Sequence, residues 1–314
     1  MLSLIKNEVG KIFHKKANWI YILVVVVALI GAGLIQQSVT DEPSENWREQ
    51  TKTEINRLQT ELEKAPNDAQ GFIKEEIARN QMLLDEDINP NAYTNWDYMN
   101  EIVIGVTMLV TLFSVIVSSA IVSSEFSAGT IKQLLIRPHP RWIILLSKYI
   151  ALVAYSLVLL ITVIAVGYIL GVLMFETGDF SAKILEPGLE GEKIATVGSQ
   201  FLWKLVYYLP SLIIIITISF MLSTLFKSQA LAVGFGIFVL FVSSTLGGII
   251  IVLAEKFEWV KFLIFPHLDL TIYATQDTIL GGVTPTISLL ILCVYYIIFM
   301  AVTFAYFQKR DISI

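Results

Sequence analysis

Six long stretches of this chain contain no Asp, Glu, Lys or Arg. They cover residues 17–40, 102–124, 149–175, 205–226, 228–254 and 278–308. Each stretch reaches the ~20 residues that a helix needs to cross a ~30 Å hydrocarbon core. Helices are favoured over strands because a backbone in lipid must satisfy its own hydrogen bonds, and the period-2 alternation of a membrane β-barrel is absent. The sequence therefore predicts an all-α integral membrane protein with six transmembrane helices.

The distribution of positive charge predicts the orientation of these spans. If the N-terminus is cytoplasmic, the inside segments are 1–16, 123–148, Lys227 and 309–314, which hold eleven Lys and Arg residues against three acids. The outside segments then hold eleven bases and 24 acids. Both termini are therefore expected to be cytoplasmic, and the net charge of −5 averages two surfaces of opposite sign.

The expected division of the chain follows from this topology. An interfacial helix at 1–16 precedes the first span, and a cytoplasmic tail at 309–314 follows the sixth. The spans are placed at 17–40, 101–124, 149–175, 204–226, 228–254 and 285–308. The outer segments are placed at 41–98, 176–203 and 255–284, and the long inner loop at 125–148.

Residues 2–16 have the pattern of an amphipathic helix that lies in the membrane interface. The expected apolar face consists of Leu2, Ile5, Val9, Ile12 and Phe13. The expected polar face consists of Lys6, Glu8, Lys11, Lys15 and Lys16. The alternative interpretation is an ordinary basic N-terminal tail.

The outer segment 41–98 is acidic and predicts a helical hairpin. Residues 41–97 hold 14 acids and six bases. One helix is expected from about Ser44 to Lys64, with Ser44 as its N-cap, and a second helix is expected after Pro66-Asn67-Asp68. The hairpin is either a spacer or gate, or an acidic vestibule that meets a cationic substrate.

The two other outer segments differ in character. Segment 176–203 is expected to be irregular because it contains several glycines and a proline. Segment 255–284 begins with closely spaced aromatic residues and scattered charges, a composition typical of the headgroup region. It is therefore expected to be an interfacial or re-entrant segment rather than a seventh span.

Several motifs that carry chemistry are absent from the sequence. There is no G-x-x-x-x-G-K-[ST] phosphate loop and no H-E-x-x-H zinc motif. The three histidines, His14, His139 and His267, lie on different segments, so neither a metal nor a cofactor is expected on this chain. The six stretches also lack the ionisable groups that proton- and sodium-coupled carriers place at mid-membrane. A driving force from outside the chain is therefore favoured, and an enzyme is disfavoured.

The inner loop Ser123–Lys148 combines positive charge with an amphipathic pattern. Its bases are Lys132, Arg137, Arg141 and Lys148, and its single acid is Glu125. The spacing of Ile131, Leu134 and Leu135 predicts a short helix, Thr130–Arg137, and Glu125 is expected to pair with a nearby base. This segment is either a plain basic loop that obeys the positive-inside rule or an element that another protein binds.

The residues around this short helix fit a stiff element. Gly129 allows the chain to turn out of the second span, and Thr130 can cap the helix. Pro138 and Pro140 end it and restrict the chain that follows. Quoted in order, the pattern is Glu125-Phe126, Gly129-Thr130-Ile131-Lys132, Leu134-Leu135, Pro138, Arg141 and Ser147-Lys148.

This pattern resembles the first cytoplasmic loop of type-2 ABC-transporter permeases, the ABC-2-type membrane subunits of bacterial exporters. The resemblance covers the whole chain, since the basic interfacial helix, the six spans and the inner termini also correspond. It implies a permease in the bacterial plasma membrane that pairs with a second copy or a paralogue and docks a separate ABC ATPase. ATP and Mg would bind that partner, and the exported substrate would be an amphipathic peptide, drug or lipid-like molecule.

The resemblance also implies which residues couple the permease to its ATPase. Thr130–Arg137 would be the coupling helix, with Glu125 and Phe126 transmitting its movement to the second span. The implied coupling residues are Glu125, Phe126, Gly129, Thr130, Ile131, Lys132, Leu134, Leu135, Arg137, Pro138 and Arg141. Membrane lipids are expected partners and nucleic acid is not.

A membrane sensor or assembly factor without a transport cycle is the alternative function. In that reading the acidic hairpin 41–98 is the receptor and the basic loop is the signalling contact. A lone ATPase encoded beside this chain favours the exporter, whereas a lone histidine kinase favours the sensor.

Overall fold

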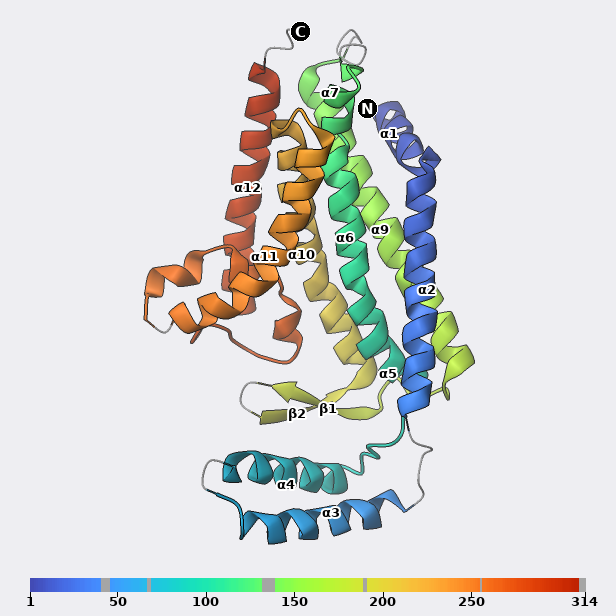
Figure 1. Ribbon diagram of the computed structural model, residues 1–314, viewed down its shortest axis with the longest axis vertical. Coiled ribbons are helices and arrows are strands. Elements are labelled where there is room, and N and C mark those ends of the chain that lie inside the picture. Colours follow the sequence, from blue (N-terminus) through green and yellow to red (C-terminus); the bar gives the residue numbers. More distant parts are fainter. Residues whose placement is uncertain (41–45, 67–68, 132–138, 189–190, 255, 311–314) are drawn as a thin grey trace. The chain divides into compact units, whose positions relative to one another are not determined.

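The computed structural model describes residues 1–40, 46–66, 69–131, 139–188, 191–254 and 256–310 (Figure 1). For residues 243–244, 247–248 and 251–252 only the backbone is described. The chain forms two compact units. Unit 1 consists of 1–28, 105–165 and 204–314, and unit 2 consists of 29–104 and 166–203.

Within the described part of the chain, five helical segments are long and apolar enough to cross a membrane. They are α2 (Lys16–Val39), the segment Asn95–Ser127, α9 (Arg141–Met174), α10 (Val197–Leu225) and α12 (Pro285–Lys309). These five coincide with five of the six predicted spans. The remaining predicted span, 228–254, coincides with α11 (Gln229–Ala254), in which the described apolar stretch is Gln229–Val242.

The segment Asn95–Ser127 is not one regular helix. It consists of α5 (Asn95–Tyr98), a π-helical turn η1 (Met99–Val103), α6 (Ile104–Ala120) and α7 (Ser123–Ser127). At its start, the Thr94 hydroxyl and the Asp97 carboxylate each accept a backbone N–H, as in a capping box. The helical backbone is interrupted before α7, and this interruption creates the element on which the candidate site is built.

The third span begins earlier than predicted. The prediction started it at residue 149 because Lys148 ended the charge-free stretch, but α9 begins at Arg141, directly after Pro140. Apolar residues such as Ile144 and Leu145 are buried in this extra segment of about two turns. The inner loop is correspondingly shorter than 125–148.

Unit 2 contains the helical hairpin that the sequence predicts. Its helices are α3 (Trp47–Leu62) and α4 (Gln70–Asp85). Ile55, Leu58 and Ile77 are buried between them, which gives the two amphipathic faces a shared core. The proposed N-cap, Ser44, lies outside the described residues, and α3 begins after Asn46.

Unit 2 also contains a small sheet, which corrects the expectation that segment 176–203 is irregular. Strands β1 (Lys183–Gly188) and β2 (Gly191–Thr196) pair antiparallel, with Ile184 opposite Ala195 and Glu186 opposite Lys193. Gly191 has a φ of 109°, a conformation that glycine adopts without strain. Gly188 and Gly191, two of the glycines taken as signs of irregularity, therefore belong to paired strands, within a fold that is mostly helical.

In unit 1, residues 256–284 form a compact segment of short 3₁₀ turns. These are η2 (Glu258–Phe262), η3 (Phe265–His267) and η4 (Thr271–Ala274). One side of the segment packs on α10, α11 and α12, where Val260, Leu268 and Tyr273 are buried. Trp259 and Phe262 remain 63% and 64% exposed, which agrees with an aromatic segment at headgroup level.

Candidate functional site

The candidate site is built around α7, the five-residue helix at the start of the predicted inner loop. Two backbone N–H groups, those of Val122 and Ser123, are left without helical partners by the break that follows α6. Both donate to the hydroxyl oxygen of Ser223 on α10, each at 3.0 Å. Ser223 is fully buried, so a single side chain of a neighbouring helix fixes the point where α7 departs from α6.

The other end of α7 is held by the chain that joins α10 to α11. The Ser127 hydroxyl donates to the carbonyl of Lys227 at 2.9 Å and accepts the N–H of Gln229 at 3.0 Å. Gly129 then turns the chain with a φ of 69°, as its expected role requires. The Thr130 hydroxyl donates back to the carbonyl of Glu125 at 3.4 Å.

A basic residue at the end of α12 contacts α7 as well. The guanidinium of Arg310 lies 4.1 Å from the ring centre of Phe126 and donates to the carbonyl of Thr224 at 2.5 Å. This position over an aromatic face is a cation–π geometry. Figure 1 shows α1, α7 and the C-terminal end of α12 gathered at one end of unit 1.

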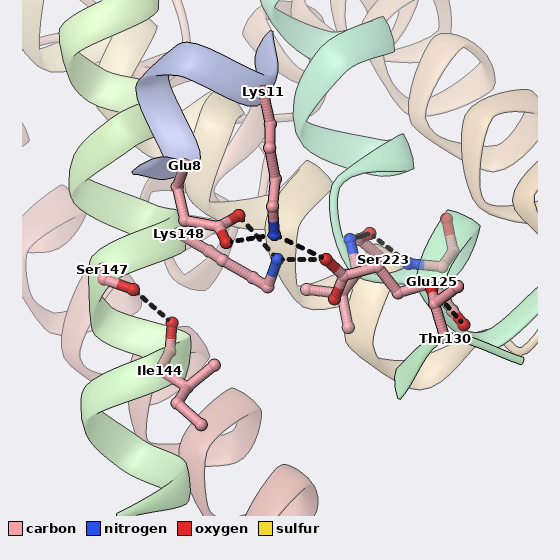
Figure 2. Close-up of polar contacts among 10 residues, drawn as sticks. Glu8, Lys11, Glu125, Thr130, Ile144, Ser147, Lys148 and Ser223 are labelled. Atoms are coloured by element: carbon pink, nitrogen blue, oxygen red, sulfur yellow. Dashed lines mark hydrogen bonds and ion pairs between the residues drawn. The ribbon is translucent and has the colours of Figure 1, made fainter. Parts of the chain in front are cut away.

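Four charged side chains join α7 to α1 (Leu2–His14) and α9 (Figure 2). The Nζ atom of Lys148 lies 2.7 Å from Oε2 of Glu8 and 2.6 Å from Oε1 of Glu125. Lys11 lies 2.6 Å from Oε1 of Glu8 and 3.6 Å from Oε1 of Glu125. We call these four residues the ionic cluster.

The ionic cluster is largely removed from water. The side chains of Lys148, Glu8 and Glu125 are 1%, 5% and 13% exposed, whereas that of Lys11 is 42% exposed. Burial by itself raises the pKa of the Glu8 carboxyl, but Lys148 and Lys11 outweigh it and lower the pKa below its ordinary value of 4.5. Both carboxylates are held by ammonium groups, so the cluster is a paired network rather than an isolated charge.

The burial of Glu8 corrects the predicted faces of the N-terminal helix. Leu4, Glu8 and Ile12 face the rest of unit 1, and Leu2, expected on the apolar face, is 84% exposed. The three buried residues are spaced by four and lie on one helical face. Glu8 lies on this face because the ammonium group of Lys148 lies opposite it. The pattern of apolar residues does not reveal this pairing.

A pocket of about 590 Å³ opens beside the ionic cluster, between α1 and α7. It is lined by Glu8, Lys11, Ile12, His14, Lys15, Ile121, Ser124, Glu125, Ala128 and Thr130. Glu125 is one of the lining residues. Its carboxylate oxygen Oε2 is buried and has no hydrogen-bond partner among the described residues.

The structure brings some of the predicted coupling residues together. Glu125, Phe126, Gly129 and Thr130 all belong to α7 or follow it directly. Ile131 is only 4% exposed, so its side chain packs within the chain. Arg141 begins α9 and donates to the carbonyls of Gln308 and Arg310 at 3.4 and 3.2 Å. Lys132, Leu134, Leu135, Arg137 and Pro138 lie outside the described residues.

Three residues of the site were not singled out from the sequence for the roles they have. Lys148 was counted as a loop base and Glu8 as part of a polar face, and Ser223 was not named. Their signals are weak but real: Glu8 is the only acid in the first 40 residues, and Lys148 directly precedes a charge-free stretch. Both are charges in places where charge is otherwise avoided.

Among the residues that the structure describes, no group of three or more His, Cys, Asp or Glu side chains could hold a metal ion. The charged groups are instead bonded to one another across three helices. A force applied near α7 would be passed on through these bonds to α1 and α9.

The fold and the site define a helical membrane protein in which several helices meet at a short interhelical element. The chain belongs to the family described as a protein of unknown function, DUF2705, whose model matches residues 72–313. It is 34% identical over 321 aligned residues to the uncharacterized protein YhcI of Bacillus subtilis (strain 168), with both chains covered completely. It is also 33% identical over 210 residues to the uncharacterized membrane protein YdbK of the same organism, covering 66% of this chain and 79% of YdbK.

Proposed function

We propose that the protein is the permease subunit of an ATP-driven exporter. It has six spans, with α11 as the fifth, and both termini are cytoplasmic, so that α1, α7 and the inner loop face the compartment that supplies ATP. It resides in the plasma membrane of a bacterium and pairs with a second permease copy or paralogue. ATP and Mg bind a separate ABC ATPase, and this chain performs no hydrolysis of its own.

The single observation that carries the proposal is the attachment of α7. This five-residue helix stands at the base of the basic loop and is tied to α1 and α9 through the ionic cluster. It is tied to α10 through Ser223 and to the α10–α11 connection through Ser127. A helix of this size gains little from its own backbone bonds, so its position is set by its neighbours and it moves with them.

The proposed mechanism follows from these attachments. The ATPase binds the segment that follows Thr130, and nucleotide-driven movement of the ATPase displaces that segment. Because α7 is separated from α6 by a break, the displacement changes the angle between them rather than bending a continuous helix. The ionic cluster then transfers the displacement to α1 and α9, and the spans rearrange between inward and outward states.

The substrate is proposed from the chemistry of the spans. The predicted spans contain no acid or base in their interiors, which suits a molecule that partitions into the bilayer rather than a coupling ion. An amphipathic peptide, drug or lipid-like molecule has this property. The acidic hairpin α3–α4 then stands on the outer face, where it acts as a spacer or gate for the exported molecule.

The decisive experiment is purification of the affinity-tagged chain from its own host in mild detergent, followed by assay of Mg-ATP hydrolysis. The proposal predicts that an ABC ATPase co-purifies and that candidate peptides stimulate hydrolysis. The double reversal Lys132→Glu and Arg137→Glu removes docking and stimulation. The matched control reverses Lys6 and Lys16, which are exposed and lie outside the inner loop.

Two outcomes would contradict the proposal. One is docking and stimulated hydrolysis that survive the loop reversal, which would remove the inner loop as the contact. The other is recovery of a histidine kinase with no ATPase, which would favour the membrane sensor.

A further inference from the structure

The pocket between α1 and α7 is a site of a size suited to a small molecule. Its volume of about 590 Å³ lies within the ~300–1,000 Å³ that such sites occupy in proteins. Its lining is partly apolar and partly polar. Ile12 and Ile121 contribute apolar surface, whereas Lys11, Lys15 and Thr130 contribute polar groups. A ligand with a polar head and an apolar body matches this lining.

The charge balance around the pocket favours an anion. The ammonium groups of Lys11, Lys15 and Lys148 and the carboxylates of Glu8 and Glu125 lie in or beside the pocket. The net charge of these groups is one positive charge. Among the described residues, Lys15 has no carboxylate within ion-pair distance. Beside it, Nδ1–H of His14 donates to the carbonyl of Gly10 at 2.7 Å, so Nε2 of the neutral ring is an acceptor and is not a ligand for an anion.

One carboxylate oxygen of the lining residue Glu125 lacks a hydrogen-bond donor, and an uncharged donor suits it best. Oε2 of Glu125 is buried without a partner, and a buried acceptor left unsatisfied costs free energy. Its other oxygen already faces two ammonium groups, so a further cation would add repulsion with them. A hydroxyl group on the ligand satisfies the oxygen without this repulsion.

The residues beside the pocket are of the types found at the depth of lipid headgroups. Lys15 stands between α1 and the first residue of the apolar helix α2, and Trp19, one turn further on, is 60% exposed. Its indole N–H bonds the carbonyl of Phe13 at 2.9 Å. Lysine and tryptophan at the end of an apolar helix are typical of the membrane–water interface, and basic pockets beside such helices bind anionic headgroups.

We propose that this pocket binds the headgroup of an anionic phospholipid that carries hydroxyl groups, for which phosphatidylglycerol is the probe. The phosphate contacts Lys15 and Lys11, and a headgroup hydroxyl donates to Glu125. The bound lipid bridges α1 and α7 on the open side of the ionic cluster. The proposal requires only that the protein is a membrane protein and does not depend on an ATPase partner.

The test measures lipid binding to the full-length, delipidated protein in detergent by native mass spectrometry. Four lipids with the same acyl chains are compared: phosphatidylglycerol, phosphatidylmethanol, phosphatidylethanolamine and phosphatidylcholine. Phosphatidylglycerol is expected to bind most tightly. Phosphatidylmethanol keeps the phosphate charge but lacks headgroup hydroxyls, so it isolates the bond to Glu125. Glycerophosphoglycerol and inorganic phosphate, added as competitors, separate the headgroup from a free anion.

Variants locate the site. Lys15→Gln should weaken phosphatidylglycerol binding roughly fivefold, which corresponds to the ~1 kcal/mol that a lysine near an anionic surface contributes. Lys6→Gln removes the same charge from an exposed position of α1 outside the pocket and should leave binding unchanged. Ala128→Trp fills the pocket from an exposed position at the end of α7 and should abolish binding without a change of charge.

Several results would overturn the proposal. Equal binding of phosphatidylglycerol and phosphatidylmethanol would remove the hydroxyl contact with Glu125. Equal losses in Lys15→Gln and Lys6→Gln would mean that only the general surface charge attracts the lipid. Full binding by Ala128→Trp would place the lipid elsewhere on the protein. Displacement of the lipid by inorganic phosphate would mean that the pocket selects a free anion.

Discussion

Lys148 and Glu125 stand at opposite ends of the predicted inner loop, and their side chains bond at 2.6 Å. The ammonium group of Lys148 is also bonded to Glu8, which lies 140 residues away in the chain. The loop is therefore closed at its base by a buried ion pair, and the N-terminal helix is fastened to the same point. This geometry makes Lys148 the shared member of both pairs, so its removal should affect three helices at once.

Replacement of Lys148 by methionine should strongly destabilise the protein. The substitution keeps most of the side-chain volume but leaves Glu8 and Glu125 buried with only Lys11 to pair them. Removal of one partner from a buried pair costs about 3–5 kcal/mol. The measurement is thermal or denaturant unfolding in detergent, compared with Lys6→Met at an exposed position.

A second variant separates the lost ion pair from lost packing. The triple change Lys148→Met, Glu8→Gln and Glu125→Gln removes both carboxylate charges together with the ammonium group. It should recover most of the stability that Lys148→Met loses, because no unpaired charge is left buried. If the triple variant is no more stable than the single one, packing around the lysine stem is the main contribution.

The ionic cluster also predicts how stability depends on pH. Lys148 and Lys11 overcome the effect of burial and hold the pKa of Glu8 below 4.5. The unfolded chain therefore binds the Glu8 proton at a higher pH than the folded chain does. The stabilisation is fully present above pH 4.5 and is lost as the pH falls through the lowered value. The difference in unfolding free energy between wild type and Glu8→Gln should shrink over this acidic window, and a constant difference would contradict the assignment.

The spans of this fold could be predicted from the sequence because charge is costly in lipid. That rule located five helices, yet it placed the start of α9 too late, at residue 149 instead of Arg141. Lys148 is a charge that the helix tolerates, since its two carboxylate partners come from α1 and α7. Those partners are remote in sequence, so the periodicity of one segment could not reveal them.

The same limit explains what the sequence left open in the site. The turn at Gly129 could be predicted because it depends on local chemistry. The pairing of Glu125 with a base was expected as well, but the sequence did not identify Lys148 as that base. The support that Ser223 gives to α7 could not, because a serine in a span ordinarily bonds its own helix. The β1–β2 hairpin was missed for another reason, since its short strands have few apolar residues and their glycines suggested a loop.

Ser223 gives a prediction about the break between α6 and α7. Ser223→Ala leaves the N–H groups of Val122 and Ser123 without their acceptor, which should cost about 1–3 kcal/mol. Ser219→Ala is the matched control: Ser219 is also buried on α10, but its hydroxyl only donates to the carbonyl of Ile215 in its own helix. Hydrogen exchange should accelerate at residues 122 and 123 in the Ser223 variant alone, and equal acceleration in both variants would contradict the role of Ser223.

The last prediction concerns His267, which is fully buried in the segment after α11. Its Nε2 lies 2.8 Å from the carbonyl of Lys261 and must donate to it, so Nδ1 accepts from the Ser288 hydroxyl at 2.8 Å. The phenol of Tyr273 bonds the same hydroxyl at 2.6 Å. This bonding pattern is compatible with a neutral ring, in which the Ser288 hydroxyl donates to Nδ1.

Burial lowers the pKa of His267 below 6.5, and the bond to the Lys261 carbonyl only partly opposes this effect. The unfolded chain therefore gains the proton first as the pH falls, so the stabilisation is complete above pH 6.5 and is lost below it. The protection of backbone amides from hydrogen exchange across residues 256–284, expressed relative to the intrinsic exchange rate at each pH, should fall between pH 7.5 and 5.5 in the wild type. His267→Gln should show a much smaller pH effect because glutamine does not titrate, whereas His14→Gln, on the exposed side of α1, should behave as wild type. An unchanged pH response in His267→Gln would show that another group destabilises the segment in acid.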